Sequence, residues 1–315
     1  MDGGHGDGVS ETPSIMSAST HSRPRAWLPV MALLTAVFMF SLIEVWVRQL
    51  LTFYPLHQVV WLRSVAALPL LLAAVVFTRH IPTEGLRPVL ALAPDRRWGL
   101  HVARSVLATV SMLCIFYAVG HLPLGTAAAL SATAPFFVSL MSKRWLGEEV
   151  SRQRWMGVGF GFMGVCLVTG PQLELDLMGV IAALLGALSS AVLMVLLRYL
   201  AQREPPPETA LFNALGISVW ASMGLWLWGG LSFRREDQWL VLGIGLLGAG
   251  AHLLASWAYR HGQAAMLAPL GFSACVWALA LGYIGFHEKP APLAMLGTIT
   301  AVSYTHLTLP TNREV

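Results

Sequence analysis

Long apolar blocks, separated by short polar connections, dominate the chain from residue 27 onward. A helix needs about 20 mostly apolar residues to cross a hydrocarbon core about 30 Å thick, because each residue adds about 1.5 Å. The expected spans are 27–47, 56–77, 98–119, 124–142, 155–170, 177–197, 209–230, 239–259, 264–286 and 291 onward. The pattern therefore predicts an all-α polytopic membrane protein with ten transmembrane helices.

The composition indicates that most of the surface faces a lipid bilayer. Apolar residues make up 56% of the 315 residues and charged residues 11%, whereas a soluble protein carries about 25% charged residues. The net charge of +4 does not indicate nucleic-acid binding, because the basic residues are dispersed and cluster between apolar blocks. Cys114, Cys166 and Cys275 lie far apart without metal-ligand spacing, so we expect no metal site and no cofactor.

Residues 1–25 are polar and contain almost nothing to bury, which predicts a disordered cytoplasmic tail. Asp2, Asp7 and Glu11 stand where a secretory signal would carry basic residues. We therefore interpret the first apolar block as a membrane helix and not as a cleaved signal.

The distribution of Lys and Arg predicts the orientation in the membrane. With the N-terminus in the cytoplasm, thirteen of these residues fall in cytoplasmic connections and four in external ones. Short cytoplasmic connections are enriched in basic residues. The asymmetry predicts an even number of crossings of the inner membrane, with both termini in the cytoplasm.

The chain contains an internal repeat. Residues 117–164 align without a gap with residues 257–304, at an offset of 140 positions. Aligned identities include Ala118 and Ala258, His121 and His261, Ala128 and Ala268, Glu148 and Glu288, and Gly157 and Gly297. Such a duplication favours a chain built of two similar halves.

Each half contains five predicted helices, at residues 26–171 and 172–302. Because five is odd, the second half must enter the membrane from the opposite side. We therefore predict two inverted five-helix repeats. Inverted repeats are a recurring plan of transporters, although a duplicated membrane protein with another role has the same pattern.

Specific residues within this pattern resemble a known family. They are Arg104, Phe116-Tyr117-Ala118, Leu122-Pro123-Leu124, Ala127-Ala128, Pro135, Leu146-Gly147-Glu148, Arg154-Trp155, Gly157, Gly161-Phe162 and Gly164-Val165, together with Tyr54-Pro55, Gln58-Val59-Val60 and Arg63. The set resembles the EamA-type domain of the drug/metabolite transporter superfamily over residues 27–302. The resemblance implies ten helices and alternating access of a small-molecule substrate to a central cavity. It does not select among the amino acids, nucleosides, cofactors and other metabolites that such proteins carry.

The chain departs from this family pattern in three places. Glu44 and Arg48 stand where many relatives carry Asp and Lys, and Cys275 replaces the proline that corresponds to Pro135. The apolar part of the last block, 291–302, reaches about 18 Å, which is too short to cross. We hypothesise that residues 303–315 are a non-native tail that replaces the end of the tenth helix. Re-sequencing of the locus tests this, since an identical tail with a genuine stop codon contradicts it.

Three ionisable residues fall near the external ends of the first two predicted helices. Glu44 and Arg48 are four positions apart and share a helix face, and Arg63 lies at a comparable depth. Charges within a membrane commonly pair with one another, so an ion-paired structural clasp is one interpretation. The other is a site for a carboxylate or phosphate of the substrate, with Glu44 as a candidate for exchanging a coupling proton.

Two further ionisable residues lie inside predicted helices. Arg104 lies about 10 Å from the cytoplasmic side, and either extends to the interface or anchors an anionic group. His252 has no charged neighbour in sequence, and is either a satisfied buried histidine or a proton relay. Glu148 is expected to bind nearby Arg side chains or backbone N–H groups at a helix start.

Aromatic residues and prolines complete the candidates. Trp257 and Tyr259 either stack on a planar substrate or pack against neighbouring helices. Pro123, Pro135 and Pro269 are candidates for kinks that act as gate hinges. Gly157 and Gly161 have the spacing of a helix-dimer contact, which indicates a possible homodimer.

Three classes of function compete for this chain. The first is a secondary transporter of a small organic metabolite, in either direction. The second is a membrane enzyme, although the sequence contains no P-loop, HExxH pair or GxSxG elbow. The third is a membrane scaffold or sensor, which lacks support because the sequence offers no sizeable extramembrane domain. We expect a transporter without enzymatic activity.

Overall fold

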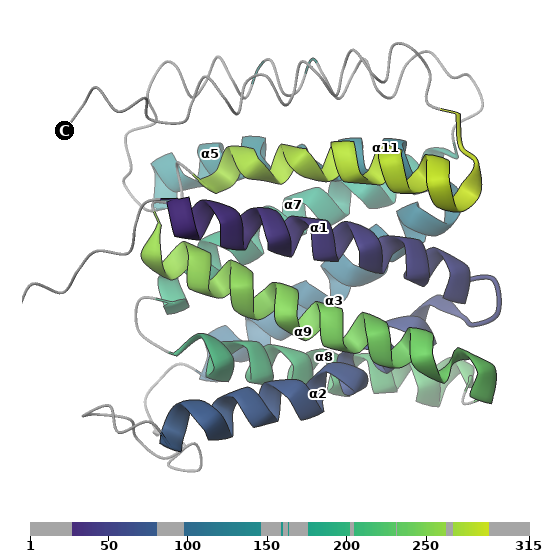
Figure 1. The fold of residues 1–315 in the computed structure, drawn as a ribbon, viewed down its shortest axis with the longest axis horizontal. Coiled ribbons are helices and arrows are strands. Elements are labelled where there is room, and N and C mark those ends of the chain that lie inside the picture. The colour runs from purple at the N-terminus through teal and green to yellow at the C-terminus, as the bar shows by residue number, and fades with distance from the viewer. Residues whose placement is uncertain are drawn as a thin grey trace, which may run out of the picture.

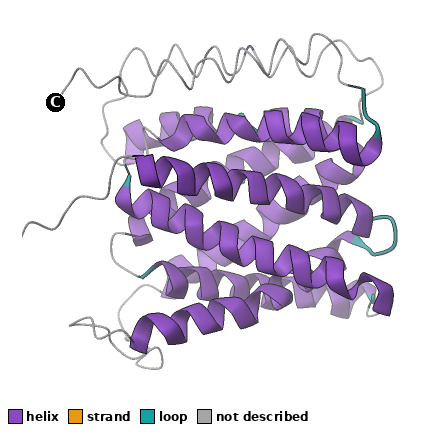
Figure 2. Cartoon of the chain, in the orientation of Figure 1, coloured by secondary structure: helices purple, strands orange, loops and turns teal. Residues whose placement is uncertain are grey.

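The computed structural model describes residues 27–80, 98–145, 159, 163, 176–201, 205–230, 232–262 and 267–289. Six helices in these ranges are long and apolar enough to cross a membrane. They are α1 (Trp27–Leu50), α2 (Leu56–His80), α3 (Trp98–His121), α7 (Leu177–Ala201), α8 (Pro206–Trp228) and α9 (Gln238–His261). The helices lie side by side in one bundle, and the described ranges contain no β-strand (Figures 1 and 2). This confirms an all-α polytopic membrane protein.

Two shorter apolar segments lie in the same bundle, and each is interrupted. α4 (Leu124–Ser131) continues into α5 (Ala134–Trp145), and the 3-10 turn η2 (Ala268–Phe272) continues into α11 (Ser273–Phe286). The Thr133 hydroxyl donates to the Leu130 carbonyl at 2.7 Å. The Ser273 hydroxyl, 140 positions later, donates to the Leu270 carbonyl at 2.6 Å. The two aligned segments therefore carry an interruption at the same aligned position.

The three candidate hinge prolines all lie at helix starts. Pro123 directly precedes α4, while Pro135 and Pro269 lie in the first turns of α5 and η2. A proline is well tolerated there because the first N–H groups of a helix have no partner within the helix. Pro69 lies inside α2, where a proline removes a helical hydrogen bond. A hinge role for the first three stays a prediction.

The helices form two groups whose neighbours correspond. α1 packs against α9 and α11, and α7 packs in the same way against α3, α4 and α5. α2 also packs against α9, as α8 packs against α3, and α2 and α8 pack against each other. Contacts that join α1 to α3 and α7 to α9 are much less extensive. We call α1, α2, α9 and α11 the α1 group, and α3, α4, α5, α7 and α8 the α7 group. Each group draws helices from both halves of the chain.

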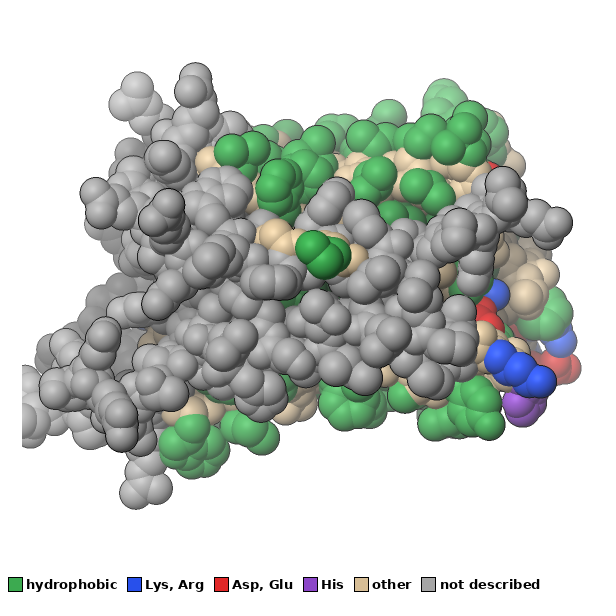
Figure 3. All heavy atoms as spheres, turned by 90° about the horizontal axis from the view of Figure 1, so that it is seen from above, with side chains coloured by type: hydrophobic (Ala, Val, Ile, Leu, Met, Phe, Trp, Pro, Cys, Tyr) green, Lys and Arg blue, Asp and Glu red, His purple; other side chains and the backbone are tan. Residues whose placement is uncertain are grey.

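The surface of the bundle fits a lipid environment. Large apolar side chains are exposed along its flanks, for example Phe77, Val219, Trp226 and Ile284. In the space-filling view, hydrophobic side chains cover the flanks, while the charged and histidine side chains that are visible gather at one end (Figure 3). This arrangement is typical of a bundle whose middle faces hydrocarbon and whose ends face water.

Several predictions from the sequence lie outside the described residues. These are the tail at 1–25, the span at 291 onward, the segment 303–315 and, apart from Gly159 and Met163, the span at 155–170. The number of ten helices therefore stays a prediction.

Close helix contacts depend on small residues. A Cβ atom added to Gly245 of α9 would lie 2.5 Å from the carbonyl carbon of Ala66 in α2. One added to Gly216 of α8 would lie 2.3 Å from the Ser105 Cβ in α3. Small residues let helix backbones approach in a membrane, where dispersion contacts replace the hydrophobic effect.

The substitution Gly245→Ala tests this packing. Because the new methyl group meets backbone atoms of α2, the two helices must move apart. We expect a loss of about 1–3 kcal/mol in the free energy of unfolding, as for overpacked cores, measured as a lower melting temperature in detergent. Gly99→Ala is the control, since a Cβ there meets nothing within 4 Å. Equal stability of both variants and the wild type would contradict the packing described.

Candidate functional site

Four of the predicted site residues lie on helices that surround the middle of the bundle. Glu44 belongs to α1, Arg63 to α2, Arg104 to α3 and His252 to α9. Charged groups are expensive in a membrane interior and therefore face a partner or a water-filled space. The contacts of each group decide which of these applies.

Arg63 lies between the two helix groups. Its side chain is 7% exposed and contacts α3, where Nη1 lies 3.5 Å from the Met112 sulfur and the guanidinium carbon lies 5.9 Å from the centre of the Phe116 ring. On the other side it passes over Gly248 of α9. The buried Nε atom has no hydrogen-bond partner. Within the described part of the chain, no carboxylate pairs with this guanidinium.

His252 lies one helical turn beyond Gly248 on α9 and extends the same region toward α1. Its ring packs edge-to-face against Phe40, with ring centres 5.2 Å apart. Phe40 lies one turn before Glu44, so both belong to one face of α1. Arg63 and Arg104 are close enough to His252 to interact electrostatically. The region thus has contributions from α1, α2, α3 and α9.

The ion-paired clasp of Glu44, Arg48 and Arg63, one of two interpretations of the sequence, is not found within the described residues. Arg48 instead donates to Glu288, and across the described ranges Glu44 makes no hydrogen bond or ion pair. The Glu44 carboxylate is near enough to Cys275 of α11 for an electrostatic interaction. Residues one helical turn apart share a face but need not pair when a better-placed partner arrives from another helix.

Arg104 joins two helices of the α7 group. Its Nη1 donates to the Thr209 carbonyl in the first turn of α8 at 2.7 Å. The side chain is 5% exposed, so it does not extend to the membrane interface as one interpretation required. This hydrogen bond of Arg104 therefore connects α3 to the start of α8.

The aromatic candidates near the end of α9 pack against the protein. Trp257 lies against His261 with ring centres 4.4 Å apart, and the His261 ring bonds the Trp257 carbonyl at 2.9 Å. The aligned pair in the first half, Tyr117 and His121, has the same arrangement at 3.9 Å and 2.8 Å. Tyr259 packs against the apolar cluster between α1 and α9. These contacts favour packing roles.

One end of the bundle carries a polar cluster that we call the Glu288 clasp, made of Arg48, Glu288 and Leu124. Arg48 Nη1 donates to Glu288 Oε1, and the Leu124 N–H donates to Glu288 Oε2 at 2.9 Å. The Arg48 guanidinium carbon also lies 4.6 Å from the centre of the Phe286 ring. Leu124 begins α4, where unpaired N–H groups favour a carboxylate. The clasp connects α1 and the end of α11 with α4, and so crosses between the two groups.

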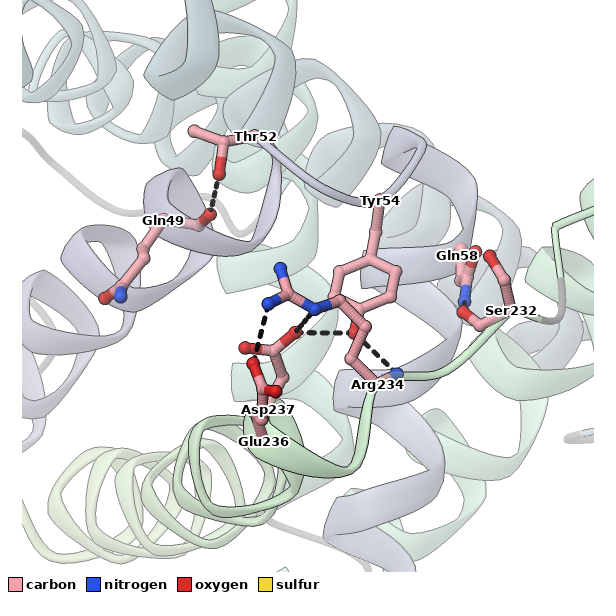
Figure 4. Close-up of polar contacts among 8 residues, drawn as sticks. All are labelled: Gln49, Thr52, Tyr54, Gln58, Ser232, Arg234, Glu236 and Asp237. Carbon is pink, nitrogen blue, oxygen red and sulfur yellow. Dashed lines mark hydrogen bonds and ion pairs between the residues drawn. The ribbon is translucent and has the colours of Figure 1, made fainter.

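A second polar cluster at the same end, the Tyr54 clasp, consists of Tyr54, Arg234, Glu236 and Asp237 (Figure 4). The Tyr54 hydroxyl donates to Asp237 Oδ2 at 2.7 Å and accepts the Arg234 N–H at 3.1 Å. Arg234 pairs with Glu236 at 2.7 Å and lies 3.9 Å from Asp237. Burial, followed by the hydrogen bond to Asp237, raises the pKa of Tyr54 above its ordinary value. The ion pair with Glu236 raises the pKa of Arg234.

Two further hydrogen bonds extend this connection between α2 and the segment after α8. Gln58 Nε2 donates to the Ser232 carbonyl at 2.8 Å, and His57 Nε2 lies 2.9 Å from the Gly229 carbonyl oxygen. The turn between α1 and α2 is thereby fixed to the connection between α8 and α9. Elsewhere in the described ranges, no three His, Cys, Asp or Glu residues are grouped to hold a metal ion.

Sequence reasoning missed both clasps. The alignment of Glu148 with Glu288, combined with the expected binding of Glu148 to Arg side chains and a helix start, was a usable signal for the Glu288 clasp. Nothing comparable marked Tyr54 and Asp237, which are 183 positions apart.

The Tyr54→Phe variant tests the Tyr54 clasp. Buried Asp237 loses its hydroxyl donor, so we expect a loss of about 1–3 kcal/mol in the free energy of unfolding at neutral pH. Tyrosine ordinarily titrates near pH 10. Because the pKa of Tyr54 is raised in the folded state, the stabilisation that Tyr54 provides is complete below that pH. The difference between wild type and variant should shrink as the pH rises through the raised pKa. Thermal unfolding from about pH 7 to 11 measures this difference.

The control is the substitution of exposed Tyr283 in Tyr283→Phe. A difference in stability between wild type and Tyr54→Phe that grows with pH contradicts the assignment.

A double-mutant cycle tests the Glu288 clasp. With Arg48→Ala and Glu288→Ala, we expect a coupling of about 1 kcal/mol, because the pair is only partly shielded from water. The exposed Arg234 and Glu236 pair provides the control cycle, where the coupling should be close to zero. If the coupling between Arg48 and Glu288 is no larger than in the control cycle, the Glu288 clasp does not stabilise the protein.

Comparisons with known proteins agree with this architecture. A family model described as the EamA-like transporter family matches residues 27–170 and again residues 177–308. A riboflavin transporter of Brucella anthropi is 29% identical over 200 residues, which cover 62% of this chain and 70% of the relative. An uncharacterized transporter of Helicobacter pylori strain J99 is 28% identical over 191 residues, covering 58% and 64%. The pseudopaline exporter CntI of Pseudomonas aeruginosa strain UCBPP-PA14 is 24% identical over 202 residues, covering 64% and 71%.

The alignment with the Helicobacter pylori protein thus spans slightly less than two thirds of that protein's length. A solved crystal structure superposes with a TM-score of 0.66 over 87% of this chain and 95% of the other, at 18% identity. That likeness shows the fold alone. The two family matches together cover well over half of the residues. The chain belongs to the EamA-like transporter family.

Proposed function

We propose that this protein is a secondary transporter that moves a small organic metabolite across the inner membrane by alternating access. Family membership supports transport, and two relatives are named for riboflavin and pseudopaline. Because those molecules differ in chemistry, the relatives do not select a substrate for this chain.

The observation that carries the proposal is the correspondence between the two helix groups. Exchanging the halves of the chain exchanges α1 with α7 and α9 with α3, and the neighbours of each helix stay the same. We infer two inverted five-helix repeats, at residues 26–171 and 172–302. Repeats of this kind give two nearly equivalent states, open to either side of a central site. The two groups are the bodies that would rock against each other.

The charged middle of the bundle supports a central site. Glu44 of α1 and His252 of α9 each keep part of their surface accessible. We infer that both face an internal space, because ionisable groups within a membrane seldom face lipid. Arg63 lies at the boundary between the groups, where a substrate would contact both of them.

The Glu288 clasp supports a closed gate at one end. The Glu288 clasp links α11 to α4, and these helices belong to different groups. The distribution of basic residues favours an external location for this end, with the N-terminus in the cytoplasm. In this proposal the Glu288 carboxylate releases the Leu124 N–H when the external side opens.

Glu44 is the proposed carrier of a coupling proton. In the described part of the chain it has no hydrogen-bond partner that would hold it in one charge state. A carboxyl group that reaches each side of the membrane in turn can bind a proton on one side and release it on the other. Transport coupled in this way requires a pH gradient for accumulation.

Uptake by proteoliposomes that contain the purified full-length protein tests this function. Labelled amino acids, nucleosides and vitamin-like cofactors are offered with and without a pH gradient. We expect saturable uptake of one class, stimulated by the gradient. Glu44→Gln should abolish accumulation while exchange of substrate across the membrane continues, and Asp176→Asn should behave as wild type. If folded, correctly inserted protein transports no solute class, the proposed function fails.

A further inference from the structure

We infer that the transported solute carries an anionic group, a carboxylate or a phosphate, and that Arg63 binds this group. This inference rests on the proposed transport function and adds the chemical class of the substrate. It starts from the unused donors of a guanidinium that protein encloses between the two helix groups.

Arg63 has more hydrogen-bond donors than its surroundings accept. A guanidinium group offers five N–H donors. The contacts found for it are the Met112 sulfur, a weak acceptor, and the face of the Phe116 ring. Nε is buried and unpaired, and the side chain is 93% buried. A charge held in this way costs several kcal/mol unless a counter-charge is supplied, and the described part of the chain supplies none by contact.

The charges nearest to Arg63 favour an anion over a zwitterion or a cation. His252 and Arg104 lie in the same electrostatic neighbourhood and add no negative charge. Glu44 of α1 makes no contact with Arg63 and lies near Cys275 of α11. A guanidinium matches a carboxylate or phosphate with two parallel hydrogen bonds, which an ammonium group does not offer.

Arg48 and Arg104, the other two candidate arginines, have protein partners. Arg104 donates to the Thr209 carbonyl, and Arg48 donates to Glu288. Arg63 touches both groups, because it extends from α2 to α3 across Gly248 of α9. An anion bound there contacts both moving bodies, and the same group serves in both open states.

The neighbours of the guanidinium suit an apolar or planar body. Met112 and Phe116 lie against Arg63, and the packed rings of Phe40 and His252 belong to the same part of the bundle. Aromatic and thioether side chains pack well against flat, weakly polar molecules. The preferred solute is therefore an organic anion larger than inorganic phosphate.

Matched ligand pairs test the inference on the full-length protein in detergent. Each pair differs by the anionic group: benzoate with benzamide, and adenosine monophosphate with adenosine. We expect the melting temperature to rise with at least one anion and not with its neutral partner, because ligands that bind the folded state stabilise it. Arg63→Gln should weaken anion binding about tenfold or more, as for a lost charged hydrogen bond. Arg63→Lys should retain part of the binding, and exposed Arg260→Gln should retain all of it.

The opposite results separate this inference from the transport function. Equal stabilisation by both members of every pair, stabilisation by neither member of any pair, or unchanged anion affinity in Arg63→Gln overturns the anion site. Saturable uptake of a neutral or cationic solute, unaffected by Arg63→Gln, also overturns it while leaving the transporter standing. Anion binding lost in Arg63→Gln, in a protein that transports nothing, supports the site and removes the proposed function.

Discussion

Burying charge in an apolar bundle costs several kcal/mol per group unless a partner of opposite charge or good hydrogen bonds compensate. This protein meets that cost differently at its end and in its middle. At one end, Arg48 and Asp237 bind partners from other segments of the α1 group, and Glu288, the partner of Arg48, also accepts the Leu124 N–H of the α7 group. In the middle, Arg63 keeps unused donors and Glu44 keeps no partner in the described ranges. Satisfied charges stabilise one arrangement of helices, whereas unsatisfied charges are available to a ligand.

The packing of the helices explains how a single arrangement can be exchanged for another. Close approach at Gly245 and Gly216 holds helices within each group, and contacts of this kind are hard to deform because backbone meets side chain directly. The groups meet most extensively where α2 packs against α8, and α4 also packs against α11, whereas α1 with α3 and α7 with α9 share little contact. In the proposed motion, one group moves against the other across these contacts. Each group contains helices from both halves of the chain. Exchanging the two halves therefore relates the state that is open at one end to the state that is open at the other.

The sequence predicted the helices well because membrane thickness sets their length. The expected span 98–119 corresponds to Trp98–His121, and 177–197 to Leu177–Ala201. It did not predict the break after Ser131, which depends on a hydroxyl that bonds a carbonyl three residues earlier. One interpretation of the helical spacing was an ion-paired clasp of Glu44 with Arg48, whereas the partner of Arg48 is Glu288, 240 positions away. Such contacts depend on how helices are arranged, and local spacing does not contain that information.

The central claim is that the two helix groups rock so that one end opens as the other closes. Spin labels at His121 and Lys289 report the end that carries the Glu288 clasp, and labels at Gly99 and Arg260 report the opposite end, in a protein whose cysteines are replaced by serine. All four positions are exposed. We expect Glu288→Gln to lengthen the distance between His121 and Lys289 and to shorten the distance between Gly99 and Arg260. The fraction of molecules that shows the longer distance should equal the fraction that shows the shorter one. Unchanged distances, or two distances that lengthen together, would contradict alternating access in this protein.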